Sequence, residues 1–549
     1  MTLRQTSWRR TSRDPQAIRF WGSAFLVTGL AVPLFLLSGH PPSLEGCDES
    51  FYAQMAREIL QTGKWVAPTF LGEVFFEKPP LLPWLVAFAY QVAGIHEWSA
   101  RLPGILTALA AIPLTGWIGR PFVGERAALI GMMVLPLCFL WVQQGRLVGQ
   151  DVPLTFLELL GIAALVAGWR GSKSWFWLTG LAFGLGLLMK SAMVLLAGAA
   201  TLPFLLSQWR RWLTAWSFWW GLLAGLGGFG VWLGLAIQQY GWRVVETLVG
   251  KVEDLGATPF HASNNQFYYF WHIPAHGFPW TVLALVGFWH LIRQQPSRTL
   301  LIWSFPLVLF LLLTIYPTRT HYYSVQLYPW LALLSGVCLD QALNWRQSPR
   351  LSQGISWGLG LLGVLLGGLG VVVIMGIPGL EMLQPHGLAL LVIGFFYSSL
   401  PVIWLWRRAL RFAGVLWLGS LLLASGVTLL SVVQRPDFGN FSPDMATFAR
   451  SSPLLPKQVV IDIGRSGLAD VCQAQAQAFY TPQPGRWVDD SALQAGDFTA
   501  DYLWVSPVQW QQFSDRLGYL QEIAEVNGWR LMQRGSRTDI LAPLDGLSR

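Results

Sequence analysis

Uncharged apolar runs long enough to cross a lipid bilayer recur along most of this chain of 549 residues. The hydrocarbon core of a bilayer, about 30 Å thick, takes about 20 consecutive apolar residues in an α-helix. The segment 81–93 is apolar but holds only about 13 residues, which favours an interfacial helix over a membrane span. We predict thirteen spans, at residues 20–38, 102–119, 127–145, 152–169, 174–189, 191–207, 212–242, 278–292, 300–316, 324–339, 351–380, 388–406 and 412–433. The sequence therefore predicts an all-α polytopic membrane domain over residues 20–433.

The composition excludes several other classes of protein. Hydrophobic residues make up 53% of the chain and charged residues 12%, which is about half the charged share of a soluble protein. Thirty-one Trp and 32 Phe are too many for a disordered chain, and four Cys are too few for a disulfide scaffold. We expect membrane lipids as partners and no nucleic acid.

Basic residues predict the orientation in the membrane. Five arginines lie within residues 1–19, which the positive-inside bias places in the cytoplasm. The next apolar run has no small-residue cleavage site, so we predict a retained anchor and not a signal peptide. With thirteen spans, the later basic clusters also fall inside, whereas counting 81–93 as a span would put them outside. The same parity places outside the loop 39–101, the loop 238–277, Asp151, Lys190, Arg319 and the segment 434–549.

Residues 434–549 hold more charged and polar side chains than the rest of the chain. Their pattern predicts an amphipathic helix at 507–524. It also predicts short strands at 459–463, 502–505, 529–533 and 538–541. We therefore expect a small extracytoplasmic α/β domain.

The four cysteines fall into two pairs by their predicted surroundings. Cys138 and Cys338 lie in apolar runs, whereas Cys47 and Cys472 are predicted to face an oxidising compartment. A disulfide between Cys47 and Cys472 is one option, which the sequence does not decide because it gives no distance. No paired Cys or His pattern typical of a metal site occurs.

The first outer loop holds the most informative polar residues. Asp48 and Glu49 begin a segment with the pattern of an amphipathic helix, which includes Tyr52, and Glu77 and Lys78 precede two prolines some thirty residues later. Acids at a helix start also favour the helix dipole and cap the helix, so a structural role is the alternative. Charges beside a bilayer are costly, which favours a function. A carboxylate can act as a general base and a lysine can bind a phosphate, so this loop indicates chemistry on a phosphorylated lipid.

Further polar residues lie at the predicted outer ends of other spans. Asp151 follows Arg146 and either caps a helix with an early proline or takes part in the chemistry. Glu158 lies on the same helix face about 10 Å deeper, where an ionisable group is functional or paired. Lys190 and Arg319 oppose the positive-inside bias, so they either snorkel to headgroup phosphates or bind the phosphate of a lipid-linked substrate.

The second outer loop, 238–277, is polar and aromatic. An aromatic belt at the membrane interface accounts for its tyrosines and tryptophans without a further function. His261 is the residue in this loop that we single out for testing.

Four motifs carry a resemblance to a known family: Asp48-Glu49, Glu77-Lys78-Pro79-Pro80, Arg146 with Asp151 before a proline-containing span, and Lys190. They are similar to motifs of the GT-C glycosyltransferases, in particular the bacterial ArnT-like branch of the protein O-mannosyltransferase superfamily. The resemblance covers roughly residues 20–345 and is most specific in residues 45–155.

The resemblance implies a GT-C fold and a sugar donor linked to polyprenyl phosphate. The acceptor would be a lipid, a protein or a glycan outside the cytoplasmic membrane. Asp48 would be the leading catalytic carboxylate, Asp151 the second, and Lys78 the group that holds the donor phosphate. Further contacts with substrate are expected from Glu49, Tyr52, Arg146, Lys190 and Arg319.

The sequence itself requires no cofactor, but the resemblance adds a divalent metal such as zinc at Glu77 and His261. We expect a monomer. The chain departs from the family at Phe51, where ArnT-like sequences often carry arginine, and near His261, where an Arg-Phe pair is absent. We therefore do not infer aminoarabinose as the sugar.

Two other classes compete with an enzyme. A transporter or lipid flippase would also place charges such as Glu158 within the membrane, but internal repeats and paired broken helices are missing from the sequence. A structural subunit would explain the C-terminal domain and leave the outer loop unexplained. A nucleotide-sugar enzyme would bind its donor inside, and no phosphate-cradling glycine motif occurs.

Overall fold

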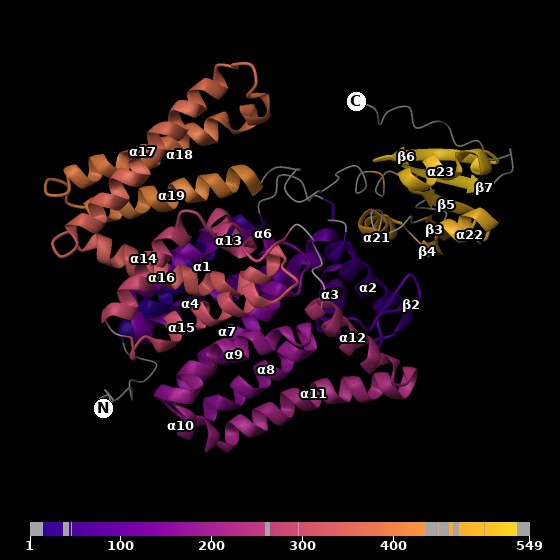
Figure 1. Ribbon diagram of the computed structural model, residues 1–549, viewed down its shortest axis with the longest axis horizontal. Helices are drawn as coiled ribbons and strands as arrows, with labels where there is room; N and C mark the ends of the chain where they lie inside the picture. The colour runs from indigo at the N-terminus through magenta and orange to yellow at the C-terminus, as the bar shows by residue number, and fades with distance from the viewer. Residues whose placement is uncertain are drawn as a thin grey trace. The chain divides into compact units, whose positions relative to one another are not determined.

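Figure 1 shows the chain as a computed structural model. Contacts divide it into two units, which we call the helical unit (Met1–Leu37, Gly104–Arg146 and Gln150–Gln434) and the mixed unit (Ser38–Pro103, Leu147–Gly149 and Arg435–Arg549). The outer loop 39–101 thus groups with the C-terminal segment. The structure describes residues 15–36, 43–44, 47–257, 264–294, 296–433, 448, 460–464, 471–481, 483–498 and 500–534.

The helical unit consists of α-helices joined by short turns (Figure 1). Its first long helices are α1 (Pro15–Leu36) and α4 (Glu97–Val123). The first turns of α4, up to Pro103, belong to the mixed unit. The helices that follow are α5 (Glu125–Val134), α6 (Phe139–Gly145), α7 (Asp151–Arg170), α8 (Phe176–Lys190), α9 (Met193–Ser207), α10 (Trp209–Leu213), α11 (Trp216–Tyr240), α12 (Arg243–Ala257), α13 (Tyr268–Gly277), α14 (Trp280–Gln294), α15 (Leu300–Ile315), α16 (Tyr328–Leu343), α17 (Pro349–Ile374), α18 (Gly387–Leu405) and α19 (Ala413–Val433). Short 3-10 helices add η1 (Leu135–Leu137), η2 (Lys173–Trp175), η3 (His321–Leu327) and η4 (Glu381–His386).

Each predicted span overlaps at least one helix, but the span 127–145 is broken into α5, η1 and α6, and the span 212–242 takes in the end of α10 before α11. Among the described residues, seven helices are long and apolar enough to cross a membrane. The number rises to nine if two bent pairs count as one span each, α5–α6 with a bend of 62° and α13–α14 with a bend of 108°. Helices α8, α9, α15 and α16 have 15 or 16 residues, fewer than the about 20 that a straight span needs. The chain is a multi-pass membrane protein, and the number thirteen stays a prediction.

Glycines allow neighbouring helices of the helical unit to approach closely. A Cβ built on Gly225 of α11 would lie 2.9 Å from Cα of Gly184 and 2.9 Å from the carbonyl oxygen of Leu181, both in α8. A Cβ on Gly370 of α17 would lie 2.9 Å from the carbonyl oxygen of Gly387 in α18. Small residues at such crossings are typical of membrane helices, because lipid gives no hydrophobic drive for association and close backbone packing takes its place.

The mixed unit begins with α2 (Asp48–Thr62), a small hairpin of β1 (Thr69–Phe70) and β2 (Glu73–Val74), and α3 (Leu81–Ala93). Its C-terminal part contains β3 (Val460–Gly464), α21 (Val471–Tyr480), β4 (Gln483–Val488), α22 (Asp490–Ala495), β5 (Tyr502–Val505), α23 (Pro507–Leu517), β6 (Leu520–Val526) and β7 (Trp529–Arg534). The sheet has the order β4-β3-β5-β7-β6. Strand β3 is parallel to β4 and β5, and β7 is antiparallel to β5 and β6.

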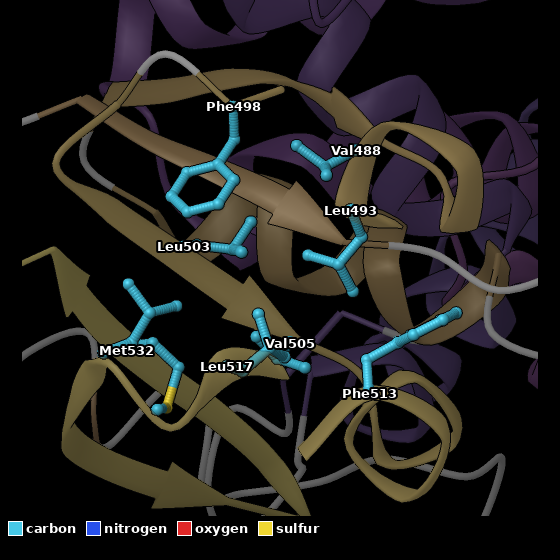
Figure 2. Close-up of a cluster of buried hydrophobic side chains, with 9 residues drawn as sticks. Val488, Leu493, Phe498, Leu503, Val505, Phe513, Leu517 and Met532 are labelled. Atoms are coloured by element: carbon cyan, nitrogen blue, oxygen red, sulfur yellow. The ribbon is translucent and has the colours of Figure 1, made fainter. Parts of the chain in front are cut away.

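One cluster of buried side chains joins this sheet to α22 and α23 (Figure 2). It is built from β4, β5, β6, β7 and the two helices, with Phe498 from the segment between α22 and β5. The cluster contains Val488, Leu493, Phe498, Leu503, Val505, Phe513, Leu517, Leu520 and Met532. The predicted small α/β domain is confirmed, with its own hydrophobic core.

Two predicted elements of this domain need comment. The helix predicted at 507–524 is wrong in its second half, because α23 ends at Leu517 and β6 begins at Leu520. Strand β6 pairs with β7 through a turn in which Asn527 and Gly528 both have positive φ, 52° and 78°. An Asn-Gly pair is a strong hairpin signal, and it outweighs the helical pattern of 507–524. The strand predicted at 538–541 lies outside the described residues.

The α8–α11 contact generates a prediction about stability. Gly225→Val should lower the free energy of unfolding by about 1–3 kcal/mol, because the added side chain meets the backbone of α8. Gly228→Val is the matched control, since it lies on the same helix and a Cβ there has no atom within 4 Å. Thermal unfolding in detergent, followed by tryptophan fluorescence, measures both. Equal melting temperatures for the two variants would contradict the close approach.

Candidate active site

Helix α2 presents the predicted acidic pair at its first turn. Cys47 precedes the helix with φ 72° and forms a disulfide with Cys472 of α21. The backbone N–H of Cys47 also donates to the carbonyl oxygen of Cys472, 3.2 Å away. The disulfide that the sequence left open is therefore present, and it fixes the residue directly before Asp48.

Asp48, Tyr52 and Lys78 form a group in the mixed unit. Nζ of Lys78 lies 3.5 Å from Oδ1 of Asp48 and donates a hydrogen bond of 2.7 Å to the hydroxyl of Tyr52. The Asp48 side chain is 53% exposed and that of Lys78 26%, so both can meet a substrate. An ion pair of this length and exposure adds little stability. The structure thus brings together three residues that the sequence singled out. Their exposure and their long ion pair favour a role in a reaction over a role in stabilising the fold.

Glu49 is placed quite differently, although it is the neighbour of Asp48. Its carboxylate accepts two hydrogen bonds from the guanidinium of Arg101, at 2.8 and 2.9 Å, and one of 3.0 Å from the backbone N–H of Val148. The side chain is 2% exposed. A buried bidentate pair of this kind anchors α2 to the start of α4, and it favours a structural role over the substrate contact that the sequence predicted.

Glu58 holds the hairpin that leads to Lys78. Its buried carboxylate accepts hydrogen bonds of 2.7 Å from both Oγ1 of Thr69 and the backbone N–H of Leu71. Leu71 and Gly72 have positive φ, 50° and 79°, so the turn between β1 and β2 costs conformational energy that these bonds offset. Glu58 therefore helps to set the path of the chain toward Lys78.

In the helical unit, Asp151 and Lys190 form a buried ion pair. Nζ of Lys190 lies 2.6 Å from Oδ1 and 2.7 Å from Oδ2 of Asp151, and the two side chains are 9–10% exposed. The ammonium group also lies 4.9 Å from the ring centroids of Tyr322 and of Tyr323. This pairing favours neither a helix cap nor snorkelling to headgroups. It unites two predicted site residues, one catalytic and one substrate-binding.

Glu158 lies in the same helix as Asp151 and is buried. Within the described part of the chain, its Oε1 atom has no hydrogen-bond partner. The sequence predicted that an ionisable group at this depth is either functional or paired. The unsatisfied Oε1 atom favours a functional role for Glu158.

The other predicted site residues have separate surroundings. Arg319 donates to the backbone carbonyls of Thr314 and Pro317, at 2.8 and 3.2 Å, and to that of Asn264 at 3.3 Å. These bonds hold its own turn, which favours a structural role over phosphate binding. Arg146 caps the end of α6 and is half-buried. Its predicted contact with substrate stays a prediction.

The predicted metal site consists of two residues, Glu77 and His261. Glu77 is half-buried in the loop before α3, and His261 lies outside the described residues. Within the described ranges, no group of three or more His, Cys, Asp or Glu side chains is placed to hold a metal ion. The metal at Glu77 and His261 therefore stays a prediction.

The sequence did not single out Arg101, which holds Glu49, or the histidine pair His272 and His276. Arg101, the partner of Glu49, stands directly before a long apolar run, and such an isolated charge is a usable signal. His272 and His276 lie four residues apart on α13, and their rings stack with centroids 4.0 Å apart. Their spacing of i and i+4 is readable in the sequence, but the burial of His272 is not.

Comparisons with known proteins agree with this picture. The family model for dolichyl-phosphate-mannose-protein mannosyltransferase matches residues 77–234. Undecaprenyl phosphate-alpha-4-amino-4-deoxy-L-arabinose arabinosyl transferase of Pseudomonas aeruginosa is 29% identical over 423 residues, 72% of this chain and 73% of that protein. The enzyme of the same name from Edwardsiella ictaluri is 31% identical over 206 residues, 35% of this chain and only 36% of that protein.

The fold itself matches a solved structure, that of ArnT from Cupriavidus metallidurans bound to undecaprenyl phosphate. The TM-score is 0.74 at 19% identity, and the match covers 95% of this chain and 98% of the other. The protein therefore has the GT-C fold of polytopic membrane glycosyltransferases. Within that class, the chain is similar to the ArnT-like branch of the protein O-mannosyltransferase superfamily, the resemblance that the motifs predicted. The comparisons give the flippase alternative no support.

The contrast between the two neighbouring acids generates a prediction. Glu49→Gln should destabilise the fold by about 3–5 kcal/mol, because it leaves the buried guanidinium of Arg101 without its charged partner. Asp48→Asn is the matched control at the same helix end and should stay within about 0.5 kcal/mol of wild type, since its side chain is exposed. Denaturation of purified protein in detergent measures the difference. Equal losses for both variants would show that Glu49 is not an anchor.

Proposed function

We propose that this chain is a glycosyltransferase that moves a sugar from a polyprenyl-phosphate donor to a lipid, protein or glycan acceptor. The reaction takes place at the extracytoplasmic face of the cytoplasmic membrane. The observation that carries the proposal is the group of Asp48, Tyr52 and Lys78, which sets an exposed carboxylate beside an ammonium at the start of a helix. The names of the relatives support a donor linked to undecaprenyl phosphate.

Asp48 acts as the general base in this proposal. Its carboxylate takes the proton of the acceptor's hydroxyl or amine group as that atom bonds to the anomeric carbon. The bond between the anomeric carbon and the phosphate oxygen breaks, and its electron pair leaves with the polyprenyl phosphate. A base that is 53% exposed can reach an acceptor, which the buried Glu49 cannot.

Lys78 stabilises the charge that grows on the departing phosphate. Its ammonium group is held by the hydroxyl of Tyr52 at 2.7 Å, so the cation is oriented before the substrate arrives. Fixed charges of this kind lower the barrier because they need no reorganisation during the reaction. Tyr52 is therefore a positioning residue for Lys78.

Asp151 is the second proposed acid, and Lys190 is its cationic partner. Removing one member of a buried ion pair strongly destabilises a protein, because the other charge is left without its partner. The proposal keeps Asp151 as the second catalytic acid and Lys190 as a substrate-binding residue, both in the helical unit. A disulfide in the mixed unit supports an oxidising compartment for the outer loop, which agrees with the predicted orientation. Zinc at Glu77 and His261 stays a proposal without a role in the steps above.

Transfer of label from a lipid carrier tests the proposal. Purified protein in liposomes is given radiolabelled undecaprenyl-phosphate sugars, including 4-amino-4-deoxy-L-arabinose, and a lipid and protein extract of bacterial membranes as acceptor. We expect label to leave the carrier with wild type, and kcat to fall about 10²- to 10⁴-fold in Asp48→Asn and about 10²- to 10³-fold in Lys78→Ala.

Two exposed residues of the same loop give matched controls, Glu73→Gln and Lys64→Ala, and both should retain wild-type rates. If all five proteins release label equally, the loop is not catalytic. Movement of intact lipid-linked sugar between leaflets, without cleavage, would favour a flippase instead.

A further inference from the structure

Helix α21 of the C-terminal domain is joined to α2, the helix that carries Asp48, at two places. The first is the disulfide between Cys47 and Cys472, with the backbone hydrogen bond of 3.2 Å beside it. The second lies about three turns further along α2, where Nη1 of Arg57 donates hydrogen bonds of 3.0 Å to the carbonyl oxygens of Phe479 and Thr481. Two attachments at a distance from each other prevent α2 from turning or sliding against α21.

A third link holds the chain just before α2. The hydroxyl of Tyr480 accepts a hydrogen bond of 2.7 Å from the backbone N–H of Leu44 and donates one of 3.3 Å to Oε1 of Glu97. Tyr480 is buried, and burial raises the pKa of its phenol, so the hydroxyl keeps its proton and both bonds. The approach to α2 is therefore fixed by the last residue of α21.

The disulfide holds the N-terminal end of α2, which has no side-chain cap of its own. Cys47 occupies the N-cap position, but no side-chain hydrogen bond caps the helix there. Its φ of 72° lies in the left-handed region, which a residue with a Cβ rarely adopts. Such a conformation persists only where the surroundings hold it, and here the covalent bond to Cys472 does so. Asp48 is the next residue, so its carboxylate depends on this constraint.

We propose that Cys47 and Cys472 are positioning residues for sugar transfer, and that their disulfide makes the activity of Asp48 depend on the redox state of the compartment. The inference rests on the proposed function. It gives the C-terminal domain a role in catalysis, because α21 keeps the general base Asp48 close to Lys78. Reduction of the disulfide by a dithiol, which is itself oxidised, gives two thiols and releases the start of α2. The remaining links at Arg57 and Tyr480 keep the domain attached.

The chain offers a clean background for this test. It contains four cysteines, and the other two, Cys138 and Cys338, are buried with at most 1% exposure. Reagents for thiols and disulfides therefore act on the Cys47–Cys472 pair. A Cys138→Ala/Cys338→Ala variant is the matched control, and it should respond to reductant as wild type does.

The experiment compares kinetics before and after reduction with dithiothreitol, using the labelled undecaprenyl-phosphate sugars and liposomes described above. We expect kcat to fall about 10- to 100-fold on reduction, as for a misplaced catalytic group, while KM for the donor changes less than about twofold. Tyr52 lies about one turn inside α2, beyond the released start of the helix, and still holds Lys78. The melting temperature should remain above the assay temperature. Glutathione disulfide should restore the rate.

A bridging reagent separates positioning from mere stability. Dibromobimane links two neighbouring thiols and becomes fluorescent when it does so, whereas N-ethylmaleimide only blocks each thiol. After reduction, the bridge should restore most of kcat together with fluorescence, and the blocking reagent should restore none. A Cys47→Ser/Cys472→Ser variant should have the low kcat under all these conditions.

The outcomes distinguish the two levels of the proposal. Unchanged kcat after full reduction would overturn the positioning role and leave the proposed function intact. A loss of activity that follows unfolding in parallel would also overturn it, because the disulfide would then only stabilise the protein. Oxidised wild type that transfers no sugar from any donor would overturn the proposed function, and this inference with it.

Discussion

Lipid cannot hydrogen-bond a backbone or solvate a charge, and this constraint governs where the protein can place its chemistry. Asp48, Asp151 and Lys190 all lie at a first or last residue of a helix. Between such ends, the helices pack through glycines and apolar side chains. The proposed acids and Lys190 thus lie at helix ends and Lys78 in the loop between α2 and α3, whereas Glu158, buried within α7, is the exception.

The two proposed acids illustrate two ways of keeping a carboxylate near a membrane. Asp151 is buried and neutralised by Lys190 at 2.6–2.7 Å, with two tyrosine rings beside the ammonium. Asp48 is exposed, and its distance of 3.5 Å from Lys78 leaves both groups accessible. A pair that is satisfied by itself gains little from a substrate, whereas a loosely paired one can exchange its partner for the substrate's atoms. Asp48 is therefore the better candidate for direct proton transfer.

The sequence predicts those features of the fold and the site that neighbouring residues determine, and it fails where residues far apart in the sequence determine them. Most helices of the helical unit follow from local apolar runs, whereas α12 and α13 lie in the segment predicted as the outer loop 238–277. The GT-C motifs lie within short segments. The difference between Asp48 and Glu49 is not local, because it depends on Arg101, 52 residues away. The disulfide joins residues 425 positions apart, so no pattern could decide it. The β6–β7 hairpin is an intermediate case, since its Asn-Gly turn was readable but a longer helical pattern overlapped it.

Phe51 shows how a departure from the family pattern can have a physical meaning. It stands where ArnT-like sequences often carry arginine, and its ring packs against those of Phe70 and Phe75, with centroids 4.8 and 4.7 Å apart. Phe70 in turn stacks on Trp487 of β4 at 5.4 Å. An aromatic cluster thus occupies this position and ties the outer loop to the C-terminal domain. The positive charge beside Asp48 then comes from Lys78, which makes that lysine's geometry, and the constraint that α21 places on α2, the more important for any reaction at a phosphate.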